Sequence, residues 1–362
     1  MPPEDARFPD RLRRVRQALL TDDLEALLFL DMKNIRYLTG FTGSDGVFLL
    51  KRHQSLLMVD GRYTTQAGLE AGGIRVFQYR EKLDGIAEVI TDEAIKAIGF
   101  EAAALSFELY SKLQEKIPAL GLHPLDGNLV NIRAIKDDRE IALLRAAAAL
   151  ASHTLVSMQE FIRPGLREDE VALELEYRMR QNGAAGAAFP TIVAAGVNSA
   201  LPHATPGSRK LAVGDALVID YGAVIEGYHS DETCTFVLSQ VSARFQEVYE
   251  IVKAAHGRAL AAVKAGVSCA EIDHIARDCI EAAGLGRFFS HGTGHGVGLD
   301  VHEPPRIAAP SQDVLAAGMV VTIEPGIYLP GQWGIRIEDT VLVREHDCEV
   351  LTCIPKNLTV LH

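Results

Sequence analysis

The stretch SHGTGHGVGLDVHE, residues 290–303, restricts the fold more than any other part of the chain. His291 and His295 have the i, i+4 spacing of two zinc ligands on a helix, but the four glycines between Ser290 and Leu299 would each cost about 1 kcal/mol relative to alanine in a helix. The helical zinc motif also requires a glutamate directly after the first histidine, where this chain has glycine. We therefore expect an extended segment with both histidines on one face. A Gly-rich turn with incidental histidines is the alternative.

Four apolar, strand-forming runs each contain a carboxylate, namely Asp220, Asp231, Glu324 and Glu338. A lone carboxylate in a buried strand is costly. A turn signal between the first two runs predicts a hairpin that brings Asp220 and Asp231 opposite or diagonal to each other. Arg336 precedes Glu338 by two residues, so both are expected on one face of their strand. Any one of these acids could instead face solvent or pair with an arginine.

Four carboxylates and an imidazole suit a pair of divalent cations such as Mn²⁺, Co²⁺, Zn²⁺ or Fe²⁺. Two carboxylates held close together repel each other unless a proton or a cation lies between them. Cys234 is three residues from Asp231 and is expected on the opposite face of the strand. The pattern therefore predicts a dinuclear metal site without cysteine ligands.

The two halves of the chain have different patterns. Short apolar strands alternate with helical stretches up to about residue 130, which is typical of an α/β domain with a mixed sheet. The second half combines four long helices, at 137–162, 167–183, 242–265 and 269–283, with strand-rich blocks. This pattern predicts an α+β domain in which helices cover one curved antiparallel sheet. We place the domains at residues 1–131 and 132–362.

The composition excludes several classes of protein. The net charge of -12 disfavours nucleic acid or an anionic membrane as the main partner. The five scattered cysteines predict reduced thiols and a cytoplasmic location. The first residues, MPPEDARFPDRLRRVR, contain no apolar signal-peptide core, and we expect no membrane span.

The carboxylates and one histidine resemble a known family. Asp220, Asp231, His295, Glu324 and Glu338, in this order, are similar to the five ligands of the pita-bread-fold metallopeptidases, which include aminopeptidase P, prolidase and methionine aminopeptidase. The resemblance implies an α+β pita-bread (creatinase/aminopeptidase-like) C-terminal domain and a smaller α/β creatinase-type N-terminal domain. The histidine four residues before the metal-binding one, and the N-terminal domain itself, resemble the proline-specific members.

The resemblance also implies a division of work among the ligands. Asp220 would chelate one metal, His295 and Glu324 would hold the other, and Asp231 and Glu338 would bridge the two. Mn²⁺ is the first choice of ion. Such a pair activates water for attack on a peptide carbonyl, and Glu324 is expected to move the proton.

Four more residues are assigned to the substrate side by the resemblance. His203, in the segment FPTIVAAGVNSALPHATPG, and His302 would donate to the carbonyl oxygen of the scissile bond. His291 would line the pocket for the proline ring. Arg336 would orient Asp231 or Glu338 and could also face substrate.

The implied reaction is hydrolysis of the bond before a proline at the second position of a peptide. The segment IRYLTGFTGSDG, residues 35–46, resembles shorter Xaa-Pro aminopeptidases and favours that activity over Xaa-Pro dipeptidase, the alternative. More remote alternatives are a metal-free creatinase-like hydrolase, a non-catalytic peptide-binding module, and a binding domain fused to an unrelated domain. A homodimer is typical of the proline-specific relatives.

Overall fold

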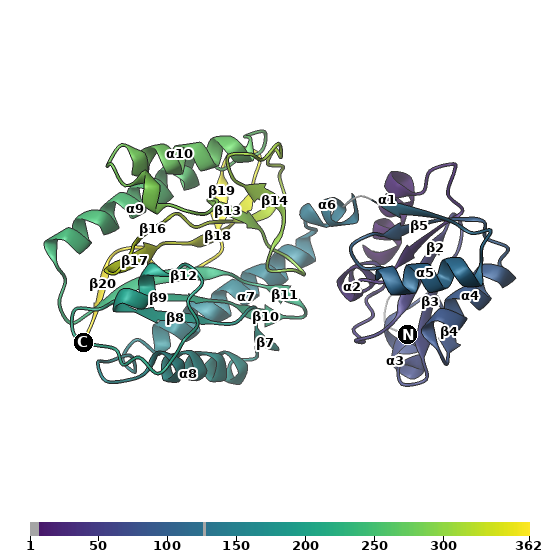
Figure 1. Ribbon diagram of the computed structural model, residues 1–362, viewed down its shortest axis with the longest axis horizontal. Coiled ribbons are helices and arrows are strands. Elements are labelled where there is room, and N and C mark those ends of the chain that lie inside the picture. Colours follow the sequence, from purple (N-terminus) through teal and green to yellow (C-terminus); the bar gives the residue numbers. More distant parts are fainter. Residues whose placement is uncertain (1–6, 126–127) are drawn as a thin grey trace. The chain divides into compact units, whose positions relative to one another are not determined.

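The computed structural model describes residues 7–125 and 128–362, and it divides into two compact units, Met1–Arg133 and Ala134–His362 (Figure 1). The expectation for the first sixteen residues therefore lies partly outside the described part. None of the helices in these ranges is both long and apolar enough to cross a membrane.

The first unit is built on a six-stranded mixed sheet with the order β4-β3-β2-β1-β5-β6. The β1–β2 and β2–β3 pairs are antiparallel, and β1–β5, β3–β4 and β5–β6 are parallel, so the predicted mixed α/β sheet is confirmed. Its strands are β1 (Ala26–Phe29), β2 (Val47–Lys51), β3 (Ser55–Asp60), β4 (Arg75–Tyr79), β5 (Ala97–Glu101) and β6 (Gly121–Leu125). Its helices are α1 (Arg7–Leu19), α2 (Met32–Thr39), α3 (Thr64–Glu70), α4 (Lys82–Asp92), α5 (Phe107–Lys116) and α6 (Asn128–Ala134), the last ending where the second unit begins.

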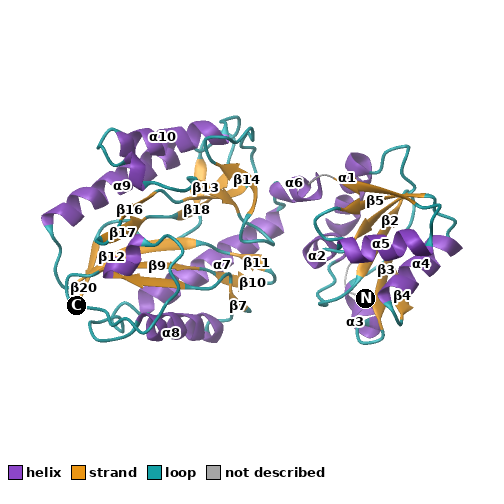
Figure 2. Ribbon diagram, viewed as in Figure 1, coloured by secondary structure: helices purple, strands orange, loops and turns teal. Residues whose placement is uncertain are grey.

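The second unit places strands between two pairs of helices. Figure 2 shows α9 (Ala243–Ala262) and α10 (Cys269–Glu281) on one side of the strands and α8 (Glu168–Gln181) on the other, where α7 (Asp138–Ser157) also packs. The apolar residues of α9 and α10 form one core and those of α7 and α8 form another. The predicted α+β arrangement is therefore present.

The strands of this unit form several hydrogen-bonded sheets instead of the single antiparallel sheet expected. A four-stranded sheet has the order β20-β12-β9-β8, and a five-stranded sheet has the order β14-β13-β15-β18-β19. The β12–β20 pair is parallel, which also departs from the expectation. These strands are β8 (Ile192–Ala195), β9 (Ala216–Tyr221), β12 (Glu232–Leu238), β13 (Gly294–Gly296), β14 (Glu303–Ile307), β15 (Val320–Ile323), β18 (Asp339–Val343), β19 (Cys348–Val350) and β20 (Thr359–Leu361). Smaller sheets join β16 (Gly326–Leu329) to β17 (Trp333–Arg336), and β7 (Gly186–Ala187) to β10 (Ala223–Ile225) and β11 (Tyr228–His229).

The helix α7 begins where the sequence predicts but ends earlier than predicted. The side chain of Asp137 accepts from the backbone N–H of Glu140, and the side chain of Glu140 accepts from the backbone N–H of Asp137, so the helix begins with a capping box. The helix ends at Ser157 rather than at Ile162, because Met158 and Phe161 donate to carbonyls only three residues back. The chain therefore tightens into turns before Pro164.

The two main sheets meet at a seam formed by β12 and the segment that leads into β18. The backbone N–H of Glu338 donates to Thr233 O at 3.2 Å, and Thr340 Oγ1 donates to Asp231 O at 2.7 Å. A third contact joins Thr235 Oγ1 to Arg336 O at 2.7 Å. The seam therefore brings two carboxylates from different sheets to the same place.

Candidate metal centre

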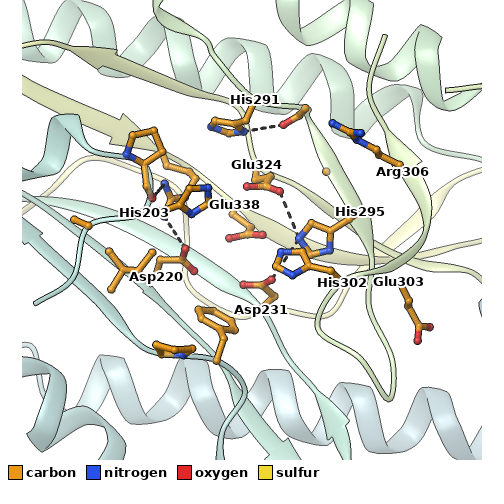
Figure 3. A pocket seen from close by; sticks show the side chains of 18 of the residues that line it. His203, Asp220, Asp231, His291, His295, His302, Glu303, Arg306, Glu324 and Glu338 are labelled. Atoms are coloured by element: carbon orange, nitrogen blue, oxygen red, sulfur yellow. Dashed lines mark hydrogen bonds and ion pairs between the residues drawn. The ribbon is translucent and has the colours of Figure 1, made fainter. Parts of the chain in front are cut away.

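A cavity of about 740 Å³ in the second unit is lined by every site residue predicted from the sequence. These residues are His203, Asp220, Asp231, His291, His295, His302, Glu324, Arg336 and Glu338. Figure 3 labels all of these residues except Arg336, and the labelled side chains converge on one space from strands and loops far apart in the chain. The Gly-rich stretch is extended, with β13 at its centre, as predicted.

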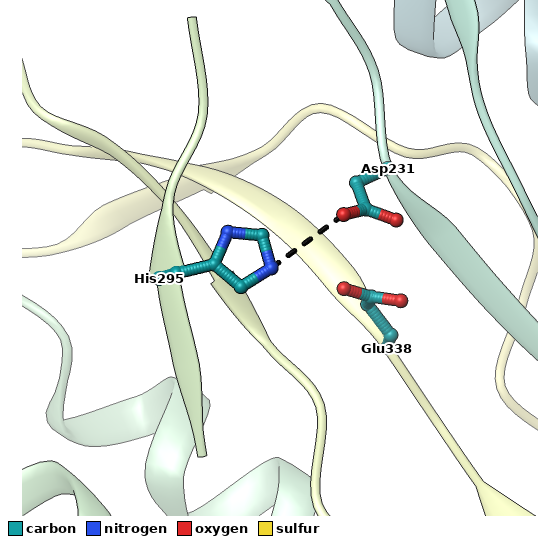
Figure 4. Close-up of side chains that lie close together, drawn as sticks. All are labelled: Asp231, His295 and Glu338. Carbon is teal, nitrogen blue, oxygen red and sulfur yellow. Dashed lines mark ion pairs between the residues drawn. The ribbon is translucent and has the colours of Figure 1, made fainter. Parts of the chain in front are cut away.

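Three of these side chains are close enough to share one ion. Ligand atoms of Asp231, His295 and Glu338 all lie within 4.8 Å of one another (Figure 4). His295 Nε2 lies 3.6 Å from Asp231 Oδ2 and 3.5 Å from Glu324 Oε1. The other imidazole nitrogen, Nδ1, lies 3.0 Å from Gly296 O and must carry the proton to donate to that carbonyl. The lone pair of Nε2 is therefore directed at the carboxylates, as a metal ligand requires.

The β9–β12 hairpin positions the two aspartates. Asp220 pairs with Thr233 across the hairpin, so Asp231, two residues before Thr233, lies diagonal to Asp220. The sequence-based prediction of an opposite or diagonal pair is therefore confirmed as diagonal. Cys234 is buried in the core behind the hairpin, away from the cavity.

We call Asp220, Asp231, Glu324 and Glu338 the acidic cluster. Burial raises the pKa of Asp231 and of Glu338 well above the usual value, and the neighbouring carboxylates raise both further. Burial also raises the pKa of Glu324 to about 8, although Arg336 acts in the opposite direction. Burial and the neighbouring carboxylates therefore disfavour the ionised form of the cluster more than Arg336 favours it.

The acidic cluster fits divalent cations. Asp220 Oδ1 is buried and has no hydrogen-bond partner among the described residues, a costly state for a carboxylate oxygen. The other donors are carboxylate oxygens and one imidazole, the set that Mn²⁺, Co²⁺, Zn²⁺ and Fe²⁺ accept. A bound cation would satisfy the orphaned oxygen and offset the mutual repulsion of the acids.

Arg336 does not have the partner predicted for it. Its Nη2 donates to Asp220 Oδ2 at 2.6 Å and its Nε donates to Thr233 Oγ1 at 3.1 Å, so it orients Asp220 rather than Asp231 or Glu338. The prediction assumed a regular strand through Glu338, but β17 ends at Arg336. The next residues turn to bond Pro325 O and Thr233 O, which breaks the two-residue alternation.

Tyr328, which the sequence analysis did not single out, fixes the state of His291. His291 Nδ1 lies 2.8 Å from Gly292 O and therefore donates, so Nε2 accepts from Tyr328 Oη at 2.8 Å. Tyr328 Oη in turn accepts from Arg336 Nη1 at 2.8 Å. Burial lowers the pKa of His291 to about 4, so the ring is neutral. Its nitrogens are thus used within the protein, and its carbon edge is left for the cavity.

The two remaining histidines lie beside the cluster. The His302 ring is 4.3 Å from the His295 ring, centroid to centroid, and burial lowers its pKa. Pro202 O accepts from Arg336 Nη1 at 3.1 Å, which anchors the loop next to His203. Both imidazoles are labelled in Figure 3 at the edge of the cluster.

Arg306 also lines the cavity and was missed from the sequence. It lies on β14, directly across from His295 in the β13–β14 register, and it is exposed. The sequence alone could not mark Arg306 as a site residue, because a charged residue in an edge strand such as EPPRI is common. Arg336, by contrast, is buried and bonded to Asp220 and Tyr328.

Comparison with known proteins gives consistent matches. The model for "Metallopeptidase family M24" matches residues 142–345, and that for "Creatinase/Prolidase N-terminal domain" matches residues 11–135. An Xaa-Pro dipeptidase of Pyrococcus horikoshii is 34% identical over 349 residues, 96% of this chain and 98% of its own.

Two solved structures are similar along almost the whole chain. One, described as an Xaa-Pro dipeptidase from Bacillus anthracis, has a TM-score of 0.95 and 38% identity and covers 98% of this chain and 100% of its own. The other, described as an X-Pro aminopeptidase from Thermotoga maritima, has a TM-score of 0.90 and 36% identity and covers 97% of this chain and 100% of its own.

Proposed function

The chain belongs to metallopeptidase family M24, and on this premise we propose that it hydrolyses the peptide bond of Xaa-Pro dipeptides. Family membership confirms the resemblance inferred from the sequence, including the pita-bread catalytic domain and the creatinase-type N-terminal domain. The preferred activity changes, however, from aminopeptidase to dipeptidase. The sequence analysis preferred an aminopeptidase on the segment at residues 35–46, whereas the relatives named as dipeptidases favour the alternative.

The family implies divalent metal ions, and we propose that five side chains hold two of them, with Mn²⁺ first. The five are Asp220, Asp231, His295, Glu324 and Glu338. The support is the buried, uncompensated acidic cluster together with the lone pair of His295. When bound, the ions activate water and polarise the scissile carbonyl.

The surrounding side chains have separate tasks in this proposal. Glu324 accepts and returns a proton, because its carboxylate lines the cavity 3.5 Å from His295 Nε2, beside the proposed ions. His203 and His302 donate to the oxygen of the scissile carbonyl. The neutral His291 offers a carbon wall to the proline ring, which lacks an N–H and so needs no acceptor there.

The observation that carries the dipeptide proposal is the exposed guanidinium of Arg306 in the cavity wall. A dipeptidase must recognise the carboxylate of the second residue, and a guanidinium binds a carboxylate through two parallel hydrogen bonds. Arg336 is already committed to Asp220, so Arg306 is the arginine in the wall that remains available.

The test uses metal-stripped protein with and without added Mn²⁺, and the substrates Ala-Pro, Ala-Pro-Ala and Ala-Ala-Ala. We expect metal-dependent cleavage of Ala-Pro. The Arg306→Ala variant should raise KM for Ala-Pro about tenfold or more, since a charged hydrogen bond is worth about 1.5–3 kcal/mol. Arg244→Ala, on the exposed face of α9, is the matched control and should change nothing. No cleavage of either proline peptide by metal-loaded protein would overturn the proposal.

The second candidate is Xaa-Pro aminopeptidase, supported by the similar structure from Thermotoga maritima. It predicts cleavage of Ala-Pro-Ala at least as fast as Ala-Pro, with no dependence on Arg306. If the protein bound no metal, the result would instead favour a metal-free creatinase-like hydrolase or a non-catalytic role.

We also propose that the protein is a cytoplasmic homodimer. The five cysteines are free thiols, as expected in a reducing compartment. Sedimentation at micromolar concentration tests the oligomer, and a sedimenting monomer would refute it.

A further inference from the structure

A second buried ionic cluster lies behind the strands that carry the metal ligands. We call Glu232, Asp339, Lys356 and His256 the lysine cluster. Lys356 Nζ lies 2.5 Å from Glu232 Oε1 and 3.3 Å from Asp339 Oδ1. His256 Nε2, from α9, lies 3.2 Å from Asp339 Oδ2. The Lys356 side chain is 9% exposed and the two carboxylates are almost fully buried, so these ion pairs are shielded from water.

Each carboxylate of the lysine cluster directly follows a proposed metal ligand, and by the family resemblance these two ligands would be shared by both ions. Glu232 follows Asp231, and Asp339 follows Glu338. Neighbouring residues in extended chain point to opposite faces. Accordingly, Asp231 and Glu338 line the cavity, whereas Glu232 and Asp339 contact Lys356 behind it.

The two carboxylates that meet Lys356 come from different sheets. Glu232 begins β12 of the four-stranded sheet, and Asp339 begins β18 of the five-stranded sheet. Lys356 comes from a third segment, between β19 and β20, and its ammonium group bridges the two strand starts. Further hydrogen bonds from Ser152 and Tyr221 reach the second oxygen of Glu232, so both of its oxygens have partners within the protein.

We propose that Lys356 is a positioning residue that sets the separation of the two bridging carboxylates, Asp231 and Glu338, by tying their strands together from behind. This inference rests on the proposed dinuclear site. A shift of either strand start along the seam would move its bridging carboxylate, because the two side chains share consecutive backbone residues. Lys356 thus acts on metal binding through Glu232 and Asp339 and touches neither metal nor substrate.

The experiment compares metal binding by the full chain and three variants. Lys356→Met removes the tie. Lys356→Met combined with Glu232→Gln removes one charge of each sign and so avoids leaving Glu232 ionised and unpaired. Lys253→Met is the matched control, because Lys253 bonds Asn357, the residue after Lys356, without contacting the lysine cluster. Circular dichroism first establishes that each variant is folded.

Two readouts separate positioning from a purely structural role. Calorimetric titration of metal-free protein with Mn²⁺ should show affinity for the weaker of two sites reduced about 10- to 100-fold in the Lys356 variants. Electron paramagnetic resonance should show that the signal of a coupled Mn²⁺ pair is lost or altered at saturating metal. The control should match the unaltered protein in both.

The outcomes distinguish this inference from the proposed function. If the unaltered protein bound no Mn²⁺, the dinuclear site would fail and this inference with it. If the unaltered protein bound two ions and the folded double variant matched it in affinity and spectrum, the role of Lys356 would be refuted while the proposed function stood. Should Lys356→Met fail to fold, the double variant decides.

Discussion

The acidic cluster and the lysine cluster meet at the same two strand starts, where Asp231 and Glu338 line the cavity and Glu232 and Asp339 contact Lys356 behind it. These four side chains are all buried, but the charges of the two clusters are balanced differently. In the lysine cluster, the Lys356 ammonium lies within ion-pair distance of both carboxylates, and the His256 imidazole lies 3.2 Å from Asp339 Oδ2. The acidic cluster has four carboxylates, of which one is bonded to Arg336. Burial alone therefore does not mark a functional site. What marks it is charge that the protein itself leaves uncompensated.

The largest effect is expected from removing Glu338 from the acidic cluster. Glu338→Ala should reduce kcat/KM for Ala-Pro by about a thousandfold or more, because the ions that Glu338 is proposed to hold would activate the attacking water. Chelation should have the same effect on the unaltered protein, and added Mn²⁺ should reverse only the second loss. Activity above a tenth of normal in the variant would contradict the assignment.

The free energy of unfolding of the metal-free protein tests the difference between the two clusters. Glu232→Ala leaves Lys356 without its closest partner and should lower the free energy of unfolding by about 3–5 kcal/mol. Asp231→Asn removes a repelling charge and should not lower it at all. Urea unfolding of metal-free protein at neutral pH gives both values. Equal losses in the two variants would mean that the clusters do not differ as described.

The pH dependence of stability should have opposite signs for the two clusters. The folded-state pKa of Glu324 is raised from 4.5 to about 8, so its contribution is present below the lower value and is lost as pH rises through about 8. Burial alone would raise the pKa of Asp339, but Lys356 and His256 outweigh it and the pKa is lowered. The contribution of Asp339 is therefore present above 3.8 and is lost as pH falls through its lower folded-state value.

Thermal melting of metal-free protein from weakly acidic to alkaline pH checks the sign for Glu324, and melting below pH 3.8 checks the sign for Asp339. The melting temperature should fall between weakly acidic and alkaline pH, and Glu324→Gln should flatten that slope. Saturating Mn²⁺ should flatten it too, since the cation holds the carboxylates ionised. A melting temperature that rose towards alkaline pH would count against the acidic cluster.

The smallest effect is expected from a solvent-facing ion pair. Arg145 on α7 donates to Glu349 at 2.9 Å, but its side chain is 46% exposed. Arg145→Ala should lower the free energy of unfolding by less than about 1 kcal/mol, and added salt should shrink the difference. A loss as large as that of Glu232→Ala would show that exposure does not separate the two kinds of pair.

Much of the site could be predicted because it follows from local patterns. Four acids within four apolar runs, Asp220 among them, indicate a shared site more strongly than any one of them does alone. The Gly-rich surroundings of His295 exclude a helix, and a short turn determines which aspartates become neighbours. These inferences need only chain geometry over a few residues.

The parts that were missed depend on contacts between distant segments. Arg336 bonds Asp220, 116 residues away, because the strand regularity assumed from its neighbours ends at that residue. The sequence around Tyr328 and Lys356 contains no motif that marks them, and their hydrogen-bond and ion-pair partners become known only from the packed structure. The division of the strands between the two main sheets likewise depends on where β12 meets the segment that leads into β18. A pattern of a few neighbouring residues cannot predict that contact.

That seam has a consequence for the unfolded chain. Thr233 and Glu338 are 105 residues apart in sequence, and their bond closes a long loop. In the chain-entropy account, a permanent cross-link over about 100 residues stabilises a fold by about 4.7 kcal/mol. An ion held by both Asp231 and Glu338 would act as such a cross-link for as long as it stays bound. The protein would then be protected against local opening most strongly where its two sheets join, and hydrogen exchange there would slow first as the ion is added.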